Sequence, residues 1–251
     1  MGTVVSIELA DDLPVPVLED MVVDVCAWLH EVDERFSTYK ESSEVNRFQR
    51  RELALDELSP DMRHVLDACA SLWRETGGYF DAYACGPLDP SGYVKGWSVE
   101  VASARLAEAG STRHYINAGG DMRMRGLSGC GVPWRVGIRH PWEPDKLSWL
   151  LAITDGAVAT SGTYERGEHV RNPRTGKPAR GLRSVTVVGP DLALADAYAT
   201  ASLAMGEGGI AWLARRSADG YASAVVTDDG RAFSSAGLPT GRVTGPTVGR
   251  S

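Results

Sequence analysis

The region between residues 114 and 188 places the strongest constraint on the fold, because it holds a succession of short segments with strand-like sequences. Each segment is rich in apolar, β-branched or aromatic residues and is bounded by Gly, Pro or Asp. Most successive segments lack room between them for the crossover helix that parallel pairing needs, so we expect antiparallel pairing. The segments are 114–117, 134–139, 147–154 and 184–188.

Helical patterns precede this region. Apolar residues recur at helical spacing over 17–37, and a second helix is predicted from Ser59, as its cap, and Pro60, at its first helical position, up to Gly77. A third helix is expected over about 95–109, after a loop rich in Gly and Pro. The first nine residues alternate like a strand.

The pattern after residue 188 completes the expected architecture. Residues 192–205 and 210–216 are predicted to be helical, and 221–227 to form a strand. The chain has no internal repeat and no shift in composition, so we predict one α+β domain with mainly antiparallel sheets and packed helices. This domain covers 1–237, and the Gly-, Pro- and Thr-rich tail, 238–251, is expected to be loose.

Charge and hydropathy exclude two classes of partner. The chain has 26 Lys plus Arg and 33 Asp plus Glu, a net charge of −7, which argues against a broad nucleic-acid-binding face. No apolar run approaches the roughly 20 residues that span a bilayer, so no membrane insertion is expected. The first residues lack the layout of a signal peptide, and we predict a cytoplasmic protein.

The cysteines give no sign of a metal site or of a disulfide framework. They lie far apart in the sequence, without a CxxC or Cys/His spacing. We interpret them as reduced thiols that mostly fill the core. They are Cys26, Cys69, Cys85 and Cys130.

Asp196 and Thr200 are the first candidate site. On a helix, residues four apart share one face, one turn apart. A carboxylate and a hydroxyl presented together suit a hard cation such as Mg²⁺, which takes oxygen ligands. The alternative is an aspartate on the helix surface beside a threonine whose hydroxyl bonds to the preceding turn.

The segment 89–97 is the second candidate. It places Asp89, an exposed glycine backbone at Gly92 and Lys95 at the junction between a loop and a helix. Free N–H groups at a helix N-terminus suit a phosphate, and a lysine adds a mobile positive charge. The alternative is a turn and a capped helix with a solvated lysine.

Two further segments carry chemistry-bearing residues. His169 ends a polar, turn-rich stretch, 160–169, and its ordinary pKa suits it to accept a hydroxyl proton, although a loop histidine is also a common surface residue. The diglycine turn in 117–121 lets a backbone approach a ligand closely. It lacks the GxGxxG pattern, and the chain has no GxxxxGK[ST], GxSxG or HExxH motif, so familiar nucleotide-binding folds are disfavoured.

Taken together and in order, these segments resemble the FAD:protein FMN transferases, the ApbE family. The resemblance runs from Met1 to about Gly206 and implies an α+β fold related to the T-fold. The matching blocks are 1–3, 36–39 with 43–46, 78–81, 89–96, 116–121, 134–141, 160–176 and 195–200.

The resemblance implies an Mg²⁺-dependent enzyme. It would cleave FAD, attach FMN through a phosphoester to a Thr or Ser hydroxyl of an acceptor flavoprotein, and release AMP. Asp196, Thr200 and the main-chain carbonyl of Gly92 would hold Mg²⁺, Asp196 would be catalytic as a metal ligand, and His169 would be the base. The expected FAD contacts are Met1, Tyr39, Phe80, Asp81, Ala82, Asp89, Lys95 and Val170.

Two departures from the family pattern keep alternatives open. The usually longer segment before Asp89 is reduced to 82–88, and Arg171 and Asn172 follow the histidine region where other residues are usual. Arg171 could contact a phosphate or an acidic partner. The alternatives are an FAD pyrophosphatase that yields FMN and AMP, and a protein that binds FAD without chemistry.

Overall fold

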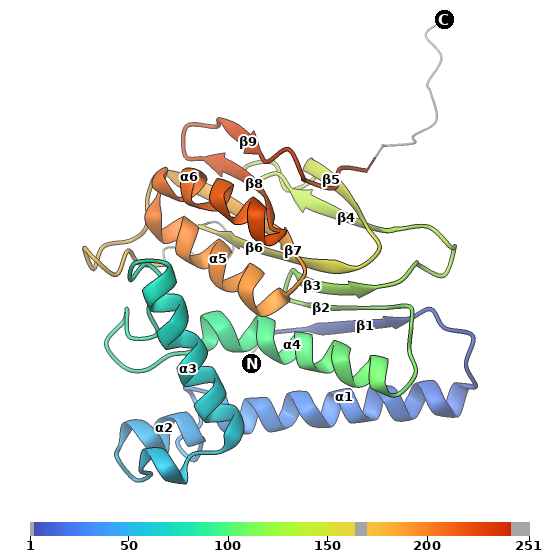
Figure 1. The fold of residues 1–251 in the computed structure, drawn as a ribbon, viewed down its shortest axis with the longest axis horizontal. Helices are drawn as coiled ribbons and strands as arrows, with labels where there is room; N and C mark the ends of the chain where they lie inside the picture. Colours follow the sequence, from blue (N-terminus) through green and yellow to red (C-terminus); the bar gives the residue numbers. More distant parts are fainter. Residues whose placement is uncertain (1–2, 164–169, 242–251) are drawn as a thin grey trace, which may run out of the picture.

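A seven-stranded antiparallel sheet forms the centre of the fold (Figure 1). The structure is a computed structural model that describes residues 3–163 and 170–241. Every strand pair in the sheet is antiparallel, as predicted, in the order β1-β2-β3-β6-β7-β8-β9. The strands are β1 (Val5–Leu9), β2 (His114–Ala118), β3 (Asp121–Arg125), β6 (Gly156–Gly162), β7 (Leu182–Gly189), β8 (Ala222–Thr227) and β9 (Ala232–Ser234).

Both faces of the central sheet are covered. Because side chains alternate along a strand, Ala157 and Ala159 of β6 pack in the core under the helices, while Val158 packs on the other side. There the second, two-stranded sheet, β4 (Trp134–Arg139) with β5 (Leu147–Ile153), covers the face. Coverage of both faces explains why β7 is buried along almost its whole length rather than at alternate residues.

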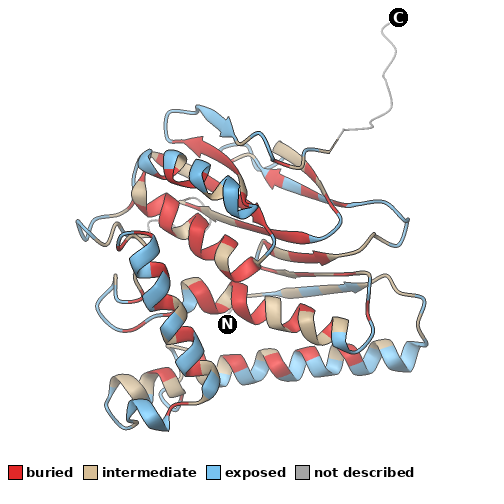
Figure 2. Ribbon diagram, viewed as in Figure 1, coloured by how far each residue is buried: buried red, intermediate tan, exposed pale blue. Residues whose placement is uncertain are grey.

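The helices cover the first face, and α5 is the most deeply buried (Figure 2). It packs against β6, β7 and α4. A Cβ atom on Gly96 of α4 would lie 2.6 Å from the Leu192 carbonyl oxygen, so the two helices meet closely only because this residue is glycine. The helices are α1 (Val15–Phe36), α2 (Glu44–Gln49), α3 (Pro60–Glu75), α4 (Ser91–Glu108), α5 (Leu192–Met205) and α6 (Gly208–Arg215), with short 3-10 turns at Leu55–Glu57 and Arg216–Asp219.

The structure corrects several sequence-based expectations. Helix α4 begins at Ser91, four residues before the predicted start, so Lys95 lies inside the helix. Strands β3, β6 and β9 and helix α2 were not predicted, because β6 is rich in Gly and hydroxyl residues and the other three are short.

Of the four cysteines only Cys69 is buried, so the interpretation of most of them as core residues is wrong; all four are free thiols. None of the helices in the described part of the chain is long and apolar enough to cross a membrane.

The first residues of the predicted tail lie on the small sheet. Leu238 is buried against β4 and β5. Thr240 bridges to Leu151, and the Gly241 N–H donates to the Leu150 carbonyl at 2.8 Å. Residues 238–241 therefore extend the edge of this sheet, and residues 242–251 lie outside the described chain.

Candidate active site

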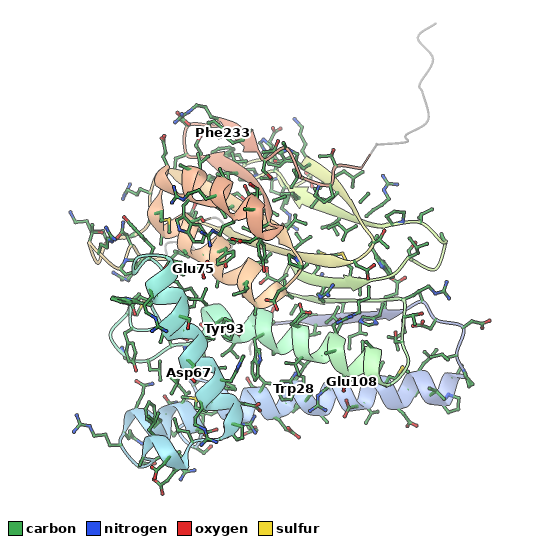
Figure 3. All side chains as sticks on the ribbon, in the orientation of Figure 1. Trp28, Asp67, Glu75, Tyr93, Glu108 and Phe233 are labelled. Atoms are coloured by element: carbon green, nitrogen blue, oxygen red, sulfur yellow. The ribbon has the colours of Figure 1, made fainter. Side chains whose placement is uncertain are left out.

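Three charged side chains from distant parts of the sequence meet beside the first turns of α4. Lys95 forms an ion pair with Asp121, the first residue of β3, and its Nζ lies 3.7 Å from Oδ1 of Asp196 on α5. The two carboxylates are 1% and 4% exposed, whereas the lysine side chain is 26% exposed. A partly exposed cation thus connects two buried carboxylates to the surface. Tyr93, in the first turn of α4, marks this end of the helix in Figure 3.

A tight turn places Asp121 in this cluster. Gly119 and Gly120 both have positive φ, 61° and 99°, a conformation that glycine adopts without strain. The Asn117 side chain accepts a hydrogen bond from the Gly120 N–H at 2.9 Å and fixes the turn. Asp121 Oδ1 then accepts from the Thr160 N–H of β6 at 3.1 Å. Neighbouring strands therefore hold the carboxylate in place.

Helix α5 presents Asp196 and Thr200 on one face, as the spacing predicts. Asp196 is 3% exposed, so the alternative interpretation as a residue on the helix surface is wrong. The Thr200 hydroxyl lies 3.1 Å from Oγ of Ser161 on β6. Oδ2 of Asp196 is buried and has no hydrogen-bond partner in the described residues. An unsatisfied buried carboxylate oxygen is costly and is a position where a cation would be favourable.

Electrostatics at the cluster favour the uptake of a further positive charge. Burial raises the pKa of Asp196 well above its usual range, and the nearby Asp121 raises this pKa further. The Lys95 ammonium acts in the opposite direction and lowers it, but less than burial raises it. One lysine therefore does not offset the charge of two buried carboxylates.

The donor set fits Mg²⁺. Asp196 and Thr200 offer a carboxylate and a hydroxyl oxygen, and Gly92, in the first turn of α4, offers a main-chain carbonyl. Residues 3–163 and 170–241 contain no group of three or more His, Cys, Asp or Glu side chains placed to hold a metal. A cation here would depend on hydroxyl, carbonyl and water oxygens besides the carboxylate, and Mg²⁺ accepts this arrangement.

Several predicted FAD contacts lie beside the N-terminus of α4. Asp89 Oδ1 accepts from the Ser91 N–H at 3.0 Å, and the Asp89 N–H donates to the Ala82 carbonyl at 2.7 Å. The second bond closes the short 82–88 segment into a compact loop. Asp81 accepts from the Tyr83 N–H at 2.8 Å at the start of this loop.

Phe80 lies directly beneath this loop. Its side chain is 2% exposed, and a Cβ atom on Gly92 would lie 3.4 Å from its ring. The ring therefore supports the first turn of α4 from inside the core. Ala82 is buried beside it.

Other predicted contacts are not brought to the cluster, or cannot be placed. Tyr39 lies in the loop between α1 and α2, with 96% of its surface exposed. Val170 is partly buried against the main core and its carbonyl accepts from the Ala179 N–H at 2.9 Å. Met1 and His169 lie outside the described residues. The FAD contacts proposed for these four positions stay predictions.

A cavity of about 360 Å³ opens between α2, the turn after it and the 82–88 loop. Its wall includes Phe48, Leu53, Tyr83 and Leu88, and none of its lining residues belongs to the Lys95 cluster. The Gln49 side chain donates to the Leu88 carbonyl and accepts from the Leu88 N–H, both at 3.0 Å. The shortened loop is thus held against α2.

Sequence reasoning missed Asp121 and Ser161 as members of the site. Asp121 ends the diglycine segment, but nothing in that segment shows that β3 lies beside α4 and α5. Ser161 stands in a polar stretch that resembles a loop, and only its pairing with β7 makes it part of a strand. The one signal available in the sequence was that Asp121 directly follows Gly119 and Gly120. A carboxylate in this position lies next to a tight turn, where a ligand can approach.

Comparisons with known proteins agree with this fold. The ApbE family matches residues 1–89 and 84–224. A FAD:protein FMN transferase of Rhodobacter capsulatus is 37% identical over 155 residues, which cover 58% of this chain and 29% of that protein. The Escherichia coli K12 protein of the same name is 31% identical over 156 residues, 58% of this chain and 44% of that protein. The match thus spans less than half the length of these relatives.

A solved structure extends the similarity to nearly the whole fold. The flavin transferase ApbE from Vibrio cholerae superposes with a TM-score of 0.80 at 25% identity, over 94% of this chain and 95% of that one. The predicted α+β architecture of mainly antiparallel sheet in a single domain is therefore confirmed.

Proposed function

This chain belongs to the ApbE family, and from that premise we propose that it transfers FMN from FAD to an acceptor flavoprotein. The relatives named FAD:protein FMN transferase support this assignment. The observation that carries it is the buried cluster of Lys95, Asp121 and Asp196 beside the Thr200 hydroxyl. This cluster combines a partly exposed ammonium with an unsatisfied carboxylate oxygen, which suits a substrate with a pyrophosphate.

The reaction exchanges the phosphoanhydride bond of FAD for a phosphoester bond to the acceptor. The oxygen of an acceptor Thr or Ser hydroxyl attacks the FMN-side phosphorus of FAD. A P–O bond forms to the acceptor, the P–O bond to the AMP phosphate breaks, and the hydroxyl proton is released. The products are an acceptor that carries FMN through a phosphoester, and AMP.

The residues of this chain bind and orient the two phosphates. The Lys95 ammonium, which reaches the surface from between two carboxylates, would contact a phosphate oxygen. The Ser91 N–H at the start of α4 donates to Asp89, and the Tyr93 and Val94 N–H groups donate to the Pro90 carbonyl, so the positive end of the helix dipole rather than a set of free N–H groups would favour the phosphates. Asp196, Thr200 and the Gly92 carbonyl would hold Mg²⁺, which supplies positive charge that stabilises the transition state and the leaving phosphate.

Two further elements complete the proposal. Asp121 holds Lys95 in position through its ion pair, while Thr160 fixes Asp121. His169 would accept the proton of the acceptor hydroxyl. A general base of this kind contributes about 10²–10⁴-fold to a rate, so its loss should reduce transfer without abolishing it.

The experiment incubates the purified protein with FAD, Mg²⁺ and a flavoprotein that carries a candidate Thr or Ser. We expect a mass increase of the acceptor by one FMN and an equal amount of AMP by chromatography. AMP and free FMN without a modified acceptor would instead establish an FAD pyrophosphatase. FAD that stays intact with every acceptor would overturn the transferase and favour a protein that only binds FAD.

A further inference from the structure

Residues 170–183 form the most basic segment of the described chain. This segment holds five cationic residues and no Asp or Glu, in a chain whose net charge is −7. Four of the five are exposed, and the fifth is half-buried. The cationic residues are Arg171, Arg174, Lys177, Arg180 and Arg183.

The segment folds as an ordered hairpin, which we call the basic hairpin. Arg171 pairs with Pro178, and the Asn172 N–H donates to the Lys177 carbonyl at 2.8 Å. Asn172 Oδ1 accepts from the Arg174 N–H at 3.0 Å and closes the turn. Figure 1 shows the hairpin projecting from the body of the molecule near the end of α3. Its charges therefore have defined positions.

The basic hairpin is attached to the candidate active site at two points. Its second arm is continuous with β7, where the Arg183 side chain donates to Thr163 Oγ1 at 3.1 Å. Thr163 lies two residues after Ser161, which contacts Thr200. At its tip, Arg174 donates to the Gly77 carbonyl at 2.8 Å, and its guanidinium lies 4.5 Å from the Tyr79 ring centroid. The hairpin therefore forms part of the rim of the site.

The exposed charges of the basic hairpin are not neutralised within the described chain. No described carboxylate forms an ion pair with Arg171, Arg174, Lys177 or Arg180. Many other arginines are paired, for example Arg216 with Glu75 and Arg105 with Asp24. Within the described residues, the hairpin is thus a cationic surface without paired carboxylates, on a protein whose net charge is −7.

The extent of this surface favours a macromolecular partner over the FAD phosphates. The side chains of Lys177 and Arg180 form no hydrogen bond or ion pair with the described residues, and both residues are exposed. A pyrophosphate carries two adjacent charges, which Lys95 and a cation at Asp196 already match. Positive charge that is spread over several residues instead attracts and orients a partner protein with a patch of negative charge.

We propose that the basic hairpin is the docking surface for the acceptor protein, and that it recognises Asp and Glu side chains close to the hydroxyl that receives FMN. This inference rests on the proposed transferase function, which requires a second protein to approach the rim of the site. The hairpin orients that protein, while the Lys95 cluster acts on FAD.

The test compares two synthetic acceptor peptides with the same central Thr. One peptide has flanking Asp and Glu residues, and the other has Asn and Gln at those positions. The variant is Lys177→Glu with Arg180→Glu, and the matched control is Arg135→Glu with Arg139→Glu, which reverses two exposed arginines on β4. Thermal melts compare the folding of both variants with that of the wild type.

We expect the hairpin variant to raise the KM for the acidic peptide by about tenfold, because charge reversal at a rim weakens association. The KM for FAD and the kcat should stay unchanged, and the β4 variant should behave like the wild type. The hairpin variant should also lose the preference for the acidic over the neutral peptide. An unchanged KM for the acidic peptide, or an equal rise in the KM for FAD, would overturn the proposal.

A binding measurement separates this inference from the transferase function. Fluorescein-labelled peptides are titrated with the protein, without FAD turnover, and followed by anisotropy. Tighter binding of the acidic peptide to the wild type, reduced in the hairpin variant and in Lys177→Gln with Arg180→Gln, supports the docking surface even if no transfer occurs. Equal binding of both peptides by all proteins contradicts it, whatever the outcome of the FAD experiment.

Discussion

Asp196 is a buried carboxylate with one oxygen that accepts no hydrogen bond from the described residues, and such a group calls for an explanation. A neutral amide at this position avoids the cost of burying a charge, and Lys95 keeps Asp121 as its partner, whereas removal of a metal ligand disrupts the site. Stability and activity should therefore respond differently to the same substitution at this position.

We expect Asp196→Asn to reduce FMN transfer at least about 100-fold, because even outer-shell changes at metal sites cost 10–100-fold. Its melting temperature should equal or exceed that of the wild type. Transfer is measured by mass at several Mg²⁺ concentrations, next to a thermal melt, with Thr200→Ser as a control that keeps the hydroxyl. Wild-type transfer by Asp196→Asn would show that this carboxylate is not a ligand.

His114 is a second buried titratable residue, and its hydrogen bonds define its protonation. The Ser111 hydroxyl donates to Asp11 at 2.6 Å, so it accepts from the Nδ1–H of His114 at 2.9 Å. Nε2 of the ring then accepts from the Ser103 hydroxyl at 2.9 Å. The neutral ring satisfies both contacts, whereas a proton added on Nε2 would make the Ser103 hydroxyl an acceptor for the ring as well as for Arg125.

Stability should therefore fall in acid. Burial, assisted by Arg125, lowers the pKa of His114 from 6.5 to about 4. Below pH 6.5 the unfolded chain takes up a proton that the folded chain does not, so the stabilisation present above pH 6.5 is lost as the pH falls to 4. The contribution to the free energy of unfolding is on the order of 2 kcal/mol.

His114→Gln keeps a donor and an acceptor without titrating. Chemical denaturation from pH 7 to 4.5 should therefore show that the free energy of unfolding of this variant depends less on pH than that of the wild type. Parallel curves would contradict this assignment.

Among the helices, the contact between α4 and α5 decides whether the site can form. Lys95 lies on α4 and Asp196 on α5, and Gly96 lets the two helices approach. We expect Gly96→Ala to separate them and to lower the free energy of unfolding by about 1–3 kcal/mol, the usual range for overpacking. Transfer should fall more than stability, because the Lys95–Asp196 distance changes as well.

Urea denaturation and the transfer assay check this prediction. Gly208→Ala on α6 is the matched control, because a Cβ atom there meets nothing within 4 Å. The free energy of unfolding of the control should be unchanged or slightly higher, because Ala has a higher helix propensity than Gly. A Gly96→Ala protein as stable and active as the control would mean that the helices adjust without loss.

The secondary structure could be predicted where a local signal exists. Ser59 and Pro60 define the start of α3, and the Ser59 hydroxyl accepts from the Met62 N–H at 3.1 Å as a cap should. Helix α5 is apolar on all sides because it is buried, and its alanine content still identified it. Strand β6 has no such signal, because its Gly and hydroxyl residues become a strand only between β3 and β7.

Across the whole molecule, the site depends on contacts between residues far apart in the chain. Asp196 with Thr200, and Lys95 near a helix start, could be proposed from spacing alone. The meeting of Asp121 with Lys95 could not, because it requires the order β3-β6-β7 in the sheet and α4 and α5 above it. Local patterns therefore predicted Lys95, Asp196 and Thr200, but neither Asp121 and Ser161 nor the assembly of the site.

The edge formed by residues 238–241 tests where the domain ends. The sequence alone places the boundary at residue 237, yet Leu238 is buried, and the Ala152 N–H donates to the Pro239 carbonyl at 2.9 Å. Loss of one buried leucine costs about 1.5–3 kcal/mol, and each kcal/mol lowers the melting temperature by about 2–4 °C in a domain of this size.

A chain truncated after residue 237 should thus melt at least about 3 °C below one truncated after residue 241. Calorimetry of the two proteins measures this difference, and Leu238→Ala in the longer one should reproduce most of it. Equal melting temperatures would show that β5 needs no cover and that the boundary at residue 237 is sufficient.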